Sequence, residues 1–248
     1  MTDILNPATS DAAESGTDKT PVVSDARTRR GTVVPLADGV PVVDGVALTG
    51  EQKAPPAGRV TWDEFLAWLD DTTRAEWVDG EVVILSPSNV EHLQIVGFLY
   101  RLLADFVEAH GLGEVFLLEL LMKFEARRTG RMPDLLFIAN EHADRLTGTL
   151  LDGPADLVVE VVSPESDRRD RSEKFAEYEA AGIPEYWLLD PIRRDAYFYE
   201  LGDDGRYHAA PTRDGTYRSG VVRGFELREE WLWRRPLPIA EARRALGV

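Results

Sequence analysis

The run 156–162, which reads Asp-Leu-Val-Val-Glu-Val-Val, constrains this chain more than any other feature. Its apolar residues predict a buried β-strand, and Glu160 places one carboxylate inside that strand. An unpaired buried carboxylate is very costly, so Glu160 needs a proton, a hydrogen-bonded partner or a metal ion. A second acid, Asp134, follows a proline and opens the apolar run 135–138. If the two strands are neighbours, the two carboxylates meet at one point, as they do in hard-cation sites that manage phosphoryl transfer.

Length and composition fit one domain preceded by a tail. The chain has 248 residues, of which 44% are hydrophobic, so a packed α/β or α+β core can form. Residues 1–57 are rich in Asp, Ser, Thr, Pro, Gly and Ala without a sustained period, which indicates a disordered or loosely attached tail. We therefore expect the folded domain to comprise residues 58–248.

The composition also argues against several classes of protein. The absence of cysteine excludes disulfides and thiolate metal sites. No stretch approaches the roughly 18 apolar residues of a membrane span, and the N-terminus lacks the basic and apolar blocks of a secretory signal. We therefore expect a cytoplasmic protein with no membrane partner. The formal net charge of −16 argues against broad nonspecific binding of nucleic acid, which depends on neutralising phosphates.

The net charge does not exclude a local basic groove formed by two clusters of arginines. They lie within a few residues of the two acid-bearing strands and comprise Arg127, Arg128 and Arg131 in the first cluster, and Arg168, Arg169 and Arg171 in the second. The candidates for contact with DNA are Arg127, Arg128, Arg131, Arg168 and Arg169. The alternative is that these arginines are solvated surface residues in turns.

The periodicity predicts a mixed order of helices and strands. A capping box at Thr61 predicts a first helix, and Asp79-Gly80 predicts a hairpin turn between two strands. Ser88-Asn89 can cap a long helix over about 90–110, which Gly111 can end. The further elements that we expect are strands at 115–125, 133–139, 155–162 and 185–190, a helix over 170–181, a hairpin of 196–200 with 206–209, strand-like segments to about 227 and a short C-terminal helix.

The predicted site can be stated residue by residue. The oxygens of Asp134 and Glu160, with the backbone carbonyl of Val161, could hold Mg²⁺ or Mn²⁺, and waters would fill the other positions. The alternatives are a turn acid after proline for Asp134 and a salt bridge at a strand edge for Glu160. Lys174 and Tyr178 are four residues apart on the predicted helix, so they share a face. A lysine directed at the site could stabilise developing charge; the alternative is a solvated lysine paired with neighbouring glutamates.

Three further residues are candidates for supporting roles. His92 lies in the first turn of the long helix, where the alternative is an ordinary hydrogen bond at a helix end. Glu76 and Glu81 flank the predicted hairpin turn, and each could equally be an exposed strand acid.

Several spaced motifs resemble the Uma2 family (DUF820) of restriction-endonuclease-like proteins. The motifs occur in the family's order between about residues 60 and 230, and they are Glu76-Trp77-Val78-Asp79-Gly80-Glu81, Glu91-His92, Pro133-Asp134-Leu135-Leu136-Phe137, the run 154–166, Glu173-Lys174, Tyr178 and the run 181–191. The resemblance implies the fold of the PD-(D/E)XK nucleases, in which a mixed central β-sheet is flanked by helices, here with extra β-hairpins.

The resemblance also implies roles for individual residues. In the PD-(D/E)XK superfamily an Asp and a Glu bind the metal, and here these positions correspond to Asp134 and Glu160. The superfamily lysine stands two residues after the Glu, where this chain has Val162. Lys174 on the following helix is the natural replacement, because a side chain about 6 Å long can reach the site from there.

Three functions follow as expectations. The first is a metal-dependent endonuclease that hydrolyses DNA phosphodiester bonds, with Mg²⁺ or Mn²⁺ as cofactor, duplex DNA as partner and a homodimer expected because a duplex has two strands. The second is a nuclease-fold binding or assembly module that has lost cleavage. The third is a metal-dependent hydrolase of a small phosphorylated molecule. Convergence of Asp134, Glu160 and Lys174 at one cleft would favour an enzyme, and an open groove would favour the endonuclease.

Overall fold

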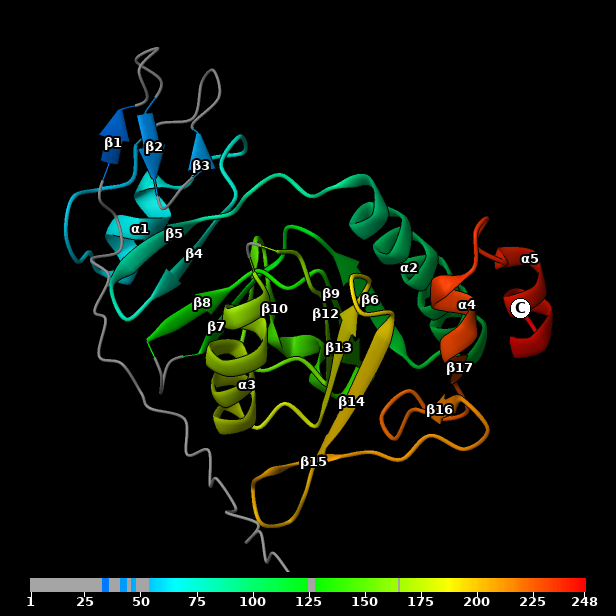
Figure 1. Ribbon diagram of the computed structural model, residues 1–248. Helices are drawn as coiled ribbons and strands as arrows, with labels where there is room; N and C mark the ends of the chain where they lie inside the picture. Colours follow the sequence, from blue (N-terminus) through cyan, green and yellow to red (C-terminus); the bar gives the residue numbers. More distant parts are fainter. Residues whose placement is uncertain (1–32, 36–40, 44–45, 48–53, 125–127, 165) are drawn as a thin grey trace, which may run out of the picture.

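The computed structural model describes residues 54–124, 128–164 and 166–248, together with three short strands before residue 48. These strands, β1 (Val33–Pro35), β2 (Pro41–Val43) and β3 (Val46–Ala47), pair in that order as a small antiparallel sheet (Figure 1). The rest of the segment 1–53 lies outside the described residues, so the expected tail stays a prediction. The Ala54 carbonyl accepts a hydrogen bond of 3.1 Å from the Trp68 indole, so the chain contacts the first helix from residue 54 onward.

The predicted buried strand, β12 (Leu157–Val161), lies in the middle of a mixed six-stranded sheet, and all its residues are buried. It pairs in parallel with one neighbour, β13, and antiparallel with the other, β9, so the predicted adjacency of the two acid-bearing strands is confirmed. The order across the sheet is β15-β14-β13-β12-β9-β6, with β6 (Gly113–Leu117), β9 (Leu135–Ala139), β13 (Glu185–Asp190), β14 (Asp195–Leu201) and β15 (Tyr207–Ala209).

A second six-stranded sheet lies beside the first. Its order is β10-β11-β7-β8-β4-β5, with β4 (Ala75–Val78), β5 (Glu81–Ile84), β7 (Leu121–Phe124), β8 (Thr129–Arg131), β10 (Leu146–Thr147) and β11 (Leu150–Asp152). The predicted turn between β4 and β5 is present, with positive φ angles of 49° at Asp79 and 88° at Gly80. Helix α1 (Trp62–Trp68) begins with the predicted capping box at Thr61, and Phe65 of this helix packs in one core with Trp77 of β4.

The expectation of a single strand over 115–125 is wrong. The chain turns at Leu118, where φ is 56°, so β6 belongs to the central sheet and β7 to the second. The Leu118 N–H donates to the Asp134 carbonyl oxygen at 3.1 Å, which ties this turn to the start of β9. The crossing is hidden in the sequence because apolar residues continue through it.

Helices cover both faces of the central sheet (Figure 1). The long helix α2 (Val90–His110) has the predicted bounds, the Asn89 cap and the left-handed Gly111 that ends it. It packs on the face that carries Leu157, Val159 and Val161, with α4 (Glu229–Trp233) and α5 (Ile239–Leu246) on the same side. Helix α3 (Phe175–Ala181) covers the face that carries Val158 and Val162.

The predicted helix over 170–181 is present, but its first part is wider than an α-helix. Residues Arg169–Lys174 form a π-helical segment, η3, which continues directly into α3, and α3 ends at the left-handed Gly182.

The remaining elements are the 3₁₀ segment η2 (Asn140–Arg145) and a small hairpin of β16 (Thr216–Arg218) and β17 (Glu226–Arg228). Over the described part of the chain, no helix has the length and apolar character to cross a membrane.

Candidate active site

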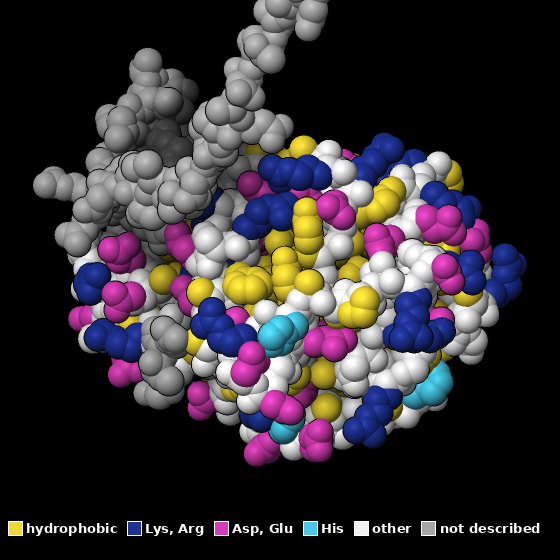
Figure 2. All heavy atoms as spheres, turned by 60° about the horizontal axis from the view of Figure 1, so that its bottom comes forward, with side chains coloured by type: hydrophobic (Ala, Val, Ile, Leu, Met, Phe, Trp, Pro, Cys, Tyr) yellow, Lys and Arg dark blue, Asp and Glu magenta, His cyan; other side chains and the backbone are white. Residues whose placement is uncertain are grey.

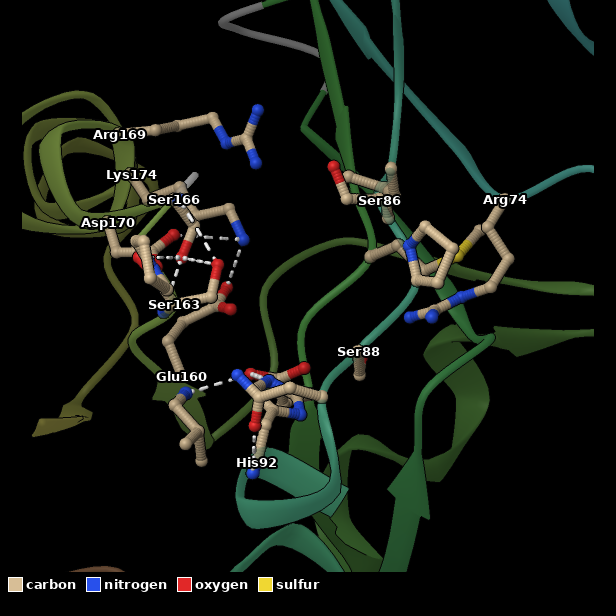
Figure 3. Close-up of a pocket in the computed structure, with 17 residues that line it drawn as sticks. Arg74, Ser86, Ser88, His92, Glu160, Ser163, Ser166, Arg169, Asp170 and Lys174 are labelled. Atoms are coloured by element: carbon tan, nitrogen blue, oxygen red, sulfur yellow. Dashed lines mark hydrogen bonds and ion pairs between the residues drawn. The ribbon is translucent and has the colours of Figure 1, made fainter. Parts of the chain in front are cut away.

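Asp134 and Glu160 lie in one cavity at the end of the two central strands. Leu135 of β9 pairs with Val159 of β12, so the next positions along the register are Asp134 and Glu160. Asp134 is only 8% exposed and Glu160 only 3%. The cavity has a volume of about 180 Å³ and is bounded by the ends of β5 and β12, the start of α2 and the segment η3 (Figure 3).

The Asp134 carboxylate is fixed by two hydrogen bonds to the same oxygen. Its Oδ2 accepts the Val161 N–H at 2.8 Å and lies 3.0 Å from Nε2 of His92. Because the N–H and C=O of one residue in an extended strand point to the same side, the Val161 carbonyl also faces the cavity, which Val161 lines. His92 stands in the first turn of α2, where its backbone N–H donates to the side chain of Asn89.

The Glu160 carboxylate is held by Lys174 and Tyr178. The Lys174 ammonium donates to Oε1 at 2.7 Å, and the Tyr178 hydroxyl donates to the same oxygen at 2.6 Å. Burial raises the pKa of Glu160 to about 8, against the effect of Lys174, and the negative charges of Asp170, Asp134 and Glu76 raise it further. Ionisation of Glu160 is therefore disfavoured among these acids, and a bound cation would favour it.

Lys174 lies where the spacing predicts, facing the acids. Burial opposes its charge, but Glu160, Glu76 and Asp170 outweigh burial and raise the pKa of Lys174, so the ammonium stays protonated. Its Nζ lies 3.4 Å from Glu76 Oε1 and 3.5 Å from Asp170 Oδ1. Asp170 is 1% exposed, and burial raises its pKa too. The π-helical turn brings both Asp170 and Lys174 to the cavity wall.

The placement of Arg131 corrects the expectation that it contacts DNA. Its side chain is fully buried, and Nη1 donates to Glu76 Oε2 at 2.6 Å while Nε donates to Glu177 Oε2 at 2.7 Å. Glu76 in turn accepts the Met132 N–H at 3.2 Å, two residues before Asp134. A guanidinium that is enclosed by two carboxylates cannot reach a phosphate, so Arg131 instead supports the segment that carries Asp134. Glu76, one of the candidates for a supporting role in the sequence analysis, binds both Arg131 and the backbone of this segment.

The other predicted residues divide into those at the cavity and those away from it. Arg169 lines the cavity, whereas Arg168 is exposed beside it. Arg171 forms ion pairs with Asp167 and Asp190. Arg128, which lies 5.9 Å from the Trp77 ring centre, and Glu81, at the start of β5, also lie outside the cavity lining. Arg127 lies outside the described residues.

Sequence reasoning missed Arg74, which lines the cavity opposite η3. A signal for it was present, because Arg74 stands two residues before Glu76 and strand alternation puts such positions on one face. The serines after β5, Ser86 and Ser88, also line the cavity and carried no distinctive signal.

The donor set fits a hard cation that keeps much of its water. Within the described part of the chain, no three His, Asp or Glu side chains are grouped so that they could hold a metal by themselves. Asp134, Glu160 and the Val161 carbonyl supply oxygen donors, which Mg²⁺ and Mn²⁺ prefer, and Mg²⁺ commonly binds through one or two carboxylates and several waters. A cation would offset the neighbouring acids that raise the pKa of Glu160, and the oxygen ligands favour a hard cation over a softer metal.

A mixed sheet flanked by helices, with buried acids and a lysine at the ends of its central strands, is the architecture of a nuclease-like α/β protein. The structure is similar to that of a "putative nuclease belonging to DUF820" from Anabaena variabilis, with a TM-score of 0.60 and 18% sequence identity over 70% of this chain and 97% of that one. The family model Uma2, described as "Putative restriction endonuclease", matches residues 62–230, and this chain belongs to that family. No curated protein matches it.

Proposed function

We propose that this protein is a metal-dependent endonuclease that hydrolyses phosphodiester bonds of DNA. The observation that carries the proposal is the convergence of Asp134, Glu160 and Lys174 in one cavity, with hydrogen bonds that fix each acid. Membership of the Uma2 family supports the same reaction class.

Asp134, Glu160 and the Val161 carbonyl are the groups that would hold Mg²⁺ or Mn²⁺. Such an ion lowers the pKa of a bound water and screens charge on a phosphodiester. In the hydrolysis, a P–O bond forms to the oxygen of water and an ester P–O bond breaks. Lys174 stays protonated at the cavity wall, so its ammonium can stabilise the negative charge that develops on the phosphate oxygens. Tyr178 and His92 orient the two carboxylates.

Contact with DNA is confined to small regions in this proposal. On the face drawn in Figure 2, basic and acidic side chains are interspersed and form no continuous basic surface. Arg168 and Arg169, next to the cavity, are the best-placed candidates to meet phosphates, and Arg128 is a more distant one. One such site cuts one strand, so cutting both strands of a duplex calls for a homodimer or for two binding events.

A second candidate function is a nuclease-fold module that binds but does not cleave. The observation in its favour is that, among the described residues, no three His, Asp or Glu side chains form a group that could hold a metal ion. The two functions differ in whether Lys174 acts on a substrate or only neutralises buried acids.

The experiment that tests the proposal is cleavage of a labelled duplex with Mg²⁺ or Mn²⁺ by the wild type and by Lys174→Met. We expect the wild type to cleave the duplex and EDTA to stop the cleavage. Lys174→Met should lower the rate by a factor of about 10²–10³, because it removes an ammonium that stabilises the negative charge of the transition state. Thermal denaturation of both proteins checks that the variant is folded. Equal residual cleavage by the two proteins would favour the non-catalytic module.

A further inference from the structure

Two arginines on opposite walls of the cavity form no ion pair. Arg74 precedes β4 and Arg169 begins η3, and among the described residues neither side chain forms an ion pair or a hydrogen bond. The Nε atom of each is buried without a hydrogen-bond partner. Figure 3 shows the two guanidinium groups turned toward the space between the walls.

This arrangement differs from that of two other arginines near the site, Arg131 and Arg171. Arg131 is neutralised by Glu76 and Glu177, and Arg171 by Asp167 and Asp190. In a chain with a net charge of −16, acidic partners are abundant. The charge of Arg169 acts on Glu76 and Asp170, but neither Arg169 nor Arg74 has a carboxylate within ion-pair distance among the described residues. Two cations that face a cavity without an ion pair therefore indicate that the partner is an anion supplied by a ligand.

Asp134, Glu160 and Asp170 line the same cavity, but two further groups of its walls favour an anion. The Asn89 cap places the N-terminus of α2, a helix of 21 residues, at the cavity, and this end of a helix carries partial positive charge. His92 is 5% exposed, and its Nδ1 atom, like the Nε atoms of the two arginines, is buried without a hydrogen-bond partner. Planar guanidinium groups match the paired oxygens of a phosphate.

We propose that Arg74 and Arg169 form a clamp that binds the phosphate backbone of the substrate from both sides of the cavity, next to Asp134 and Glu160. The inference rests on the proposed function for the identity of the substrate, but phosphate binding by the clamp does not require cleavage. Arg74 immediately precedes β4 of the second sheet and Arg169 lies in the segment that follows the central strand β12, so a bound phosphate also bridges these two parts of the chain.

The test is binding of a fluorescent DNA oligonucleotide in EDTA at several salt concentrations. We expect Arg74→Gln and Arg169→Gln each to weaken binding about tenfold and to reduce the slope of log affinity against log salt by about 1, because each removes one phosphate contact. Arg74→Lys and Arg169→Lys keep the charge without the planar fork, so we expect smaller losses. Arg244→Gln, at an exposed position of α5 outside the cavity, is the charge-matched control and should bind as the wild type does.

Cleavage of the same oligonucleotide with Mg²⁺ separates this inference from the proposed function. A wild type that cleaves, with Arg74→Gln and Arg169→Gln variants that keep the wild-type affinity and salt slope, would overturn the clamp alone. A wild type that binds but does not cleave, with the affinity lost in these two variants, would support the clamp and overturn the hydrolysis. Absence of wild-type binding would overturn both.

Discussion

Glu76 is completely buried, yet its environment favours the ionised form. Burial alone would raise its pKa, but the positive charges of Lys174, Arg131 and Arg169 outweigh burial and lower the pKa of Glu76 to about 2. A single carboxylate thus connects Arg131, which the sequence placed at a surface, to Lys174, which faces the cavity. Such a contact cannot be predicted from spacing, because the two partners are 55 and 98 residues away along the chain.

This pKa predicts how stability depends on pH. The pKa of Glu76 is lower in the folded state than in the unfolded state, so its stabilising contribution is complete above about pH 4.5 and is lost as the pH falls toward about 2. We expect Glu76→Gln to reduce the dependence of the free energy of unfolding on pH in this window by up to about 1.4 kcal/mol per pH unit. Urea denaturation at a series of pH values measures it. An unchanged slope would show that Glu76 is not ionised in the folded protein.

At the scale of the elements, two glycines differ in what surrounds them. A Cβ at Gly113 in β6 would lie 2.0 Å from the backbone carbonyl oxygen of Ile138 in the paired strand, which cannot move without breaking the sheet register. A Cβ at Gly97, in the middle of α2, would meet no atom within 4 Å. Only the first glycine is therefore required by packing.

Two substitutions to alanine test this difference. We expect Gly113→Ala to lower the free energy of unfolding by about 1–3 kcal/mol through overpacking. Gly97→Ala should raise it by about 0.5–1 kcal/mol, because alanine is the better helix former. Chemical denaturation measures both values. Equal effects of the two variants would contradict the register of β6 with β9.

The elements also show how far the sequence determines the fold. The bounds of α2, the turn at Asp79-Gly80 and the pairing of β9 with β12 were predictable, because caps, turn residues and apolar runs are local signals. The turn at Leu118 was not, since an apolar run gives no sign that the chain passes from one sheet to another. The π-helical turn of η3 was also not predictable, although it brings both Asp170 and Lys174 to the cavity.

At the scale of the whole molecule, the segment before Ala54 is expected to be dispensable for stability. Its composition offers few apolar side chains to offset roughly 1–2 kcal/mol of backbone entropy per ordered residue. A chain that starts at Ala54 keeps the hydrogen bond to Trp68. We expect its melting temperature to lie within about 2 °C of that of the full chain, by calorimetry. A decrease of more than about 5 °C would show that the segment packs on the domain.

The central claim is that Asp134 and Glu160 hold the ion that makes this protein a nuclease. The most direct measurement is the nicking of supercoiled plasmid with Mg²⁺ or Mn²⁺ by wild type, Glu160→Gln and the control Glu81→Gln, purified identically. Glu81 lies on β5 outside the cavity, so the control removes one carboxylate without touching the site. We predict metal-dependent nicking by the wild type and by Glu81→Gln, and none by Glu160→Gln, because a charged ligand is lost while the shape is kept. Equal nicking by all three proteins, or by none, would contradict the account.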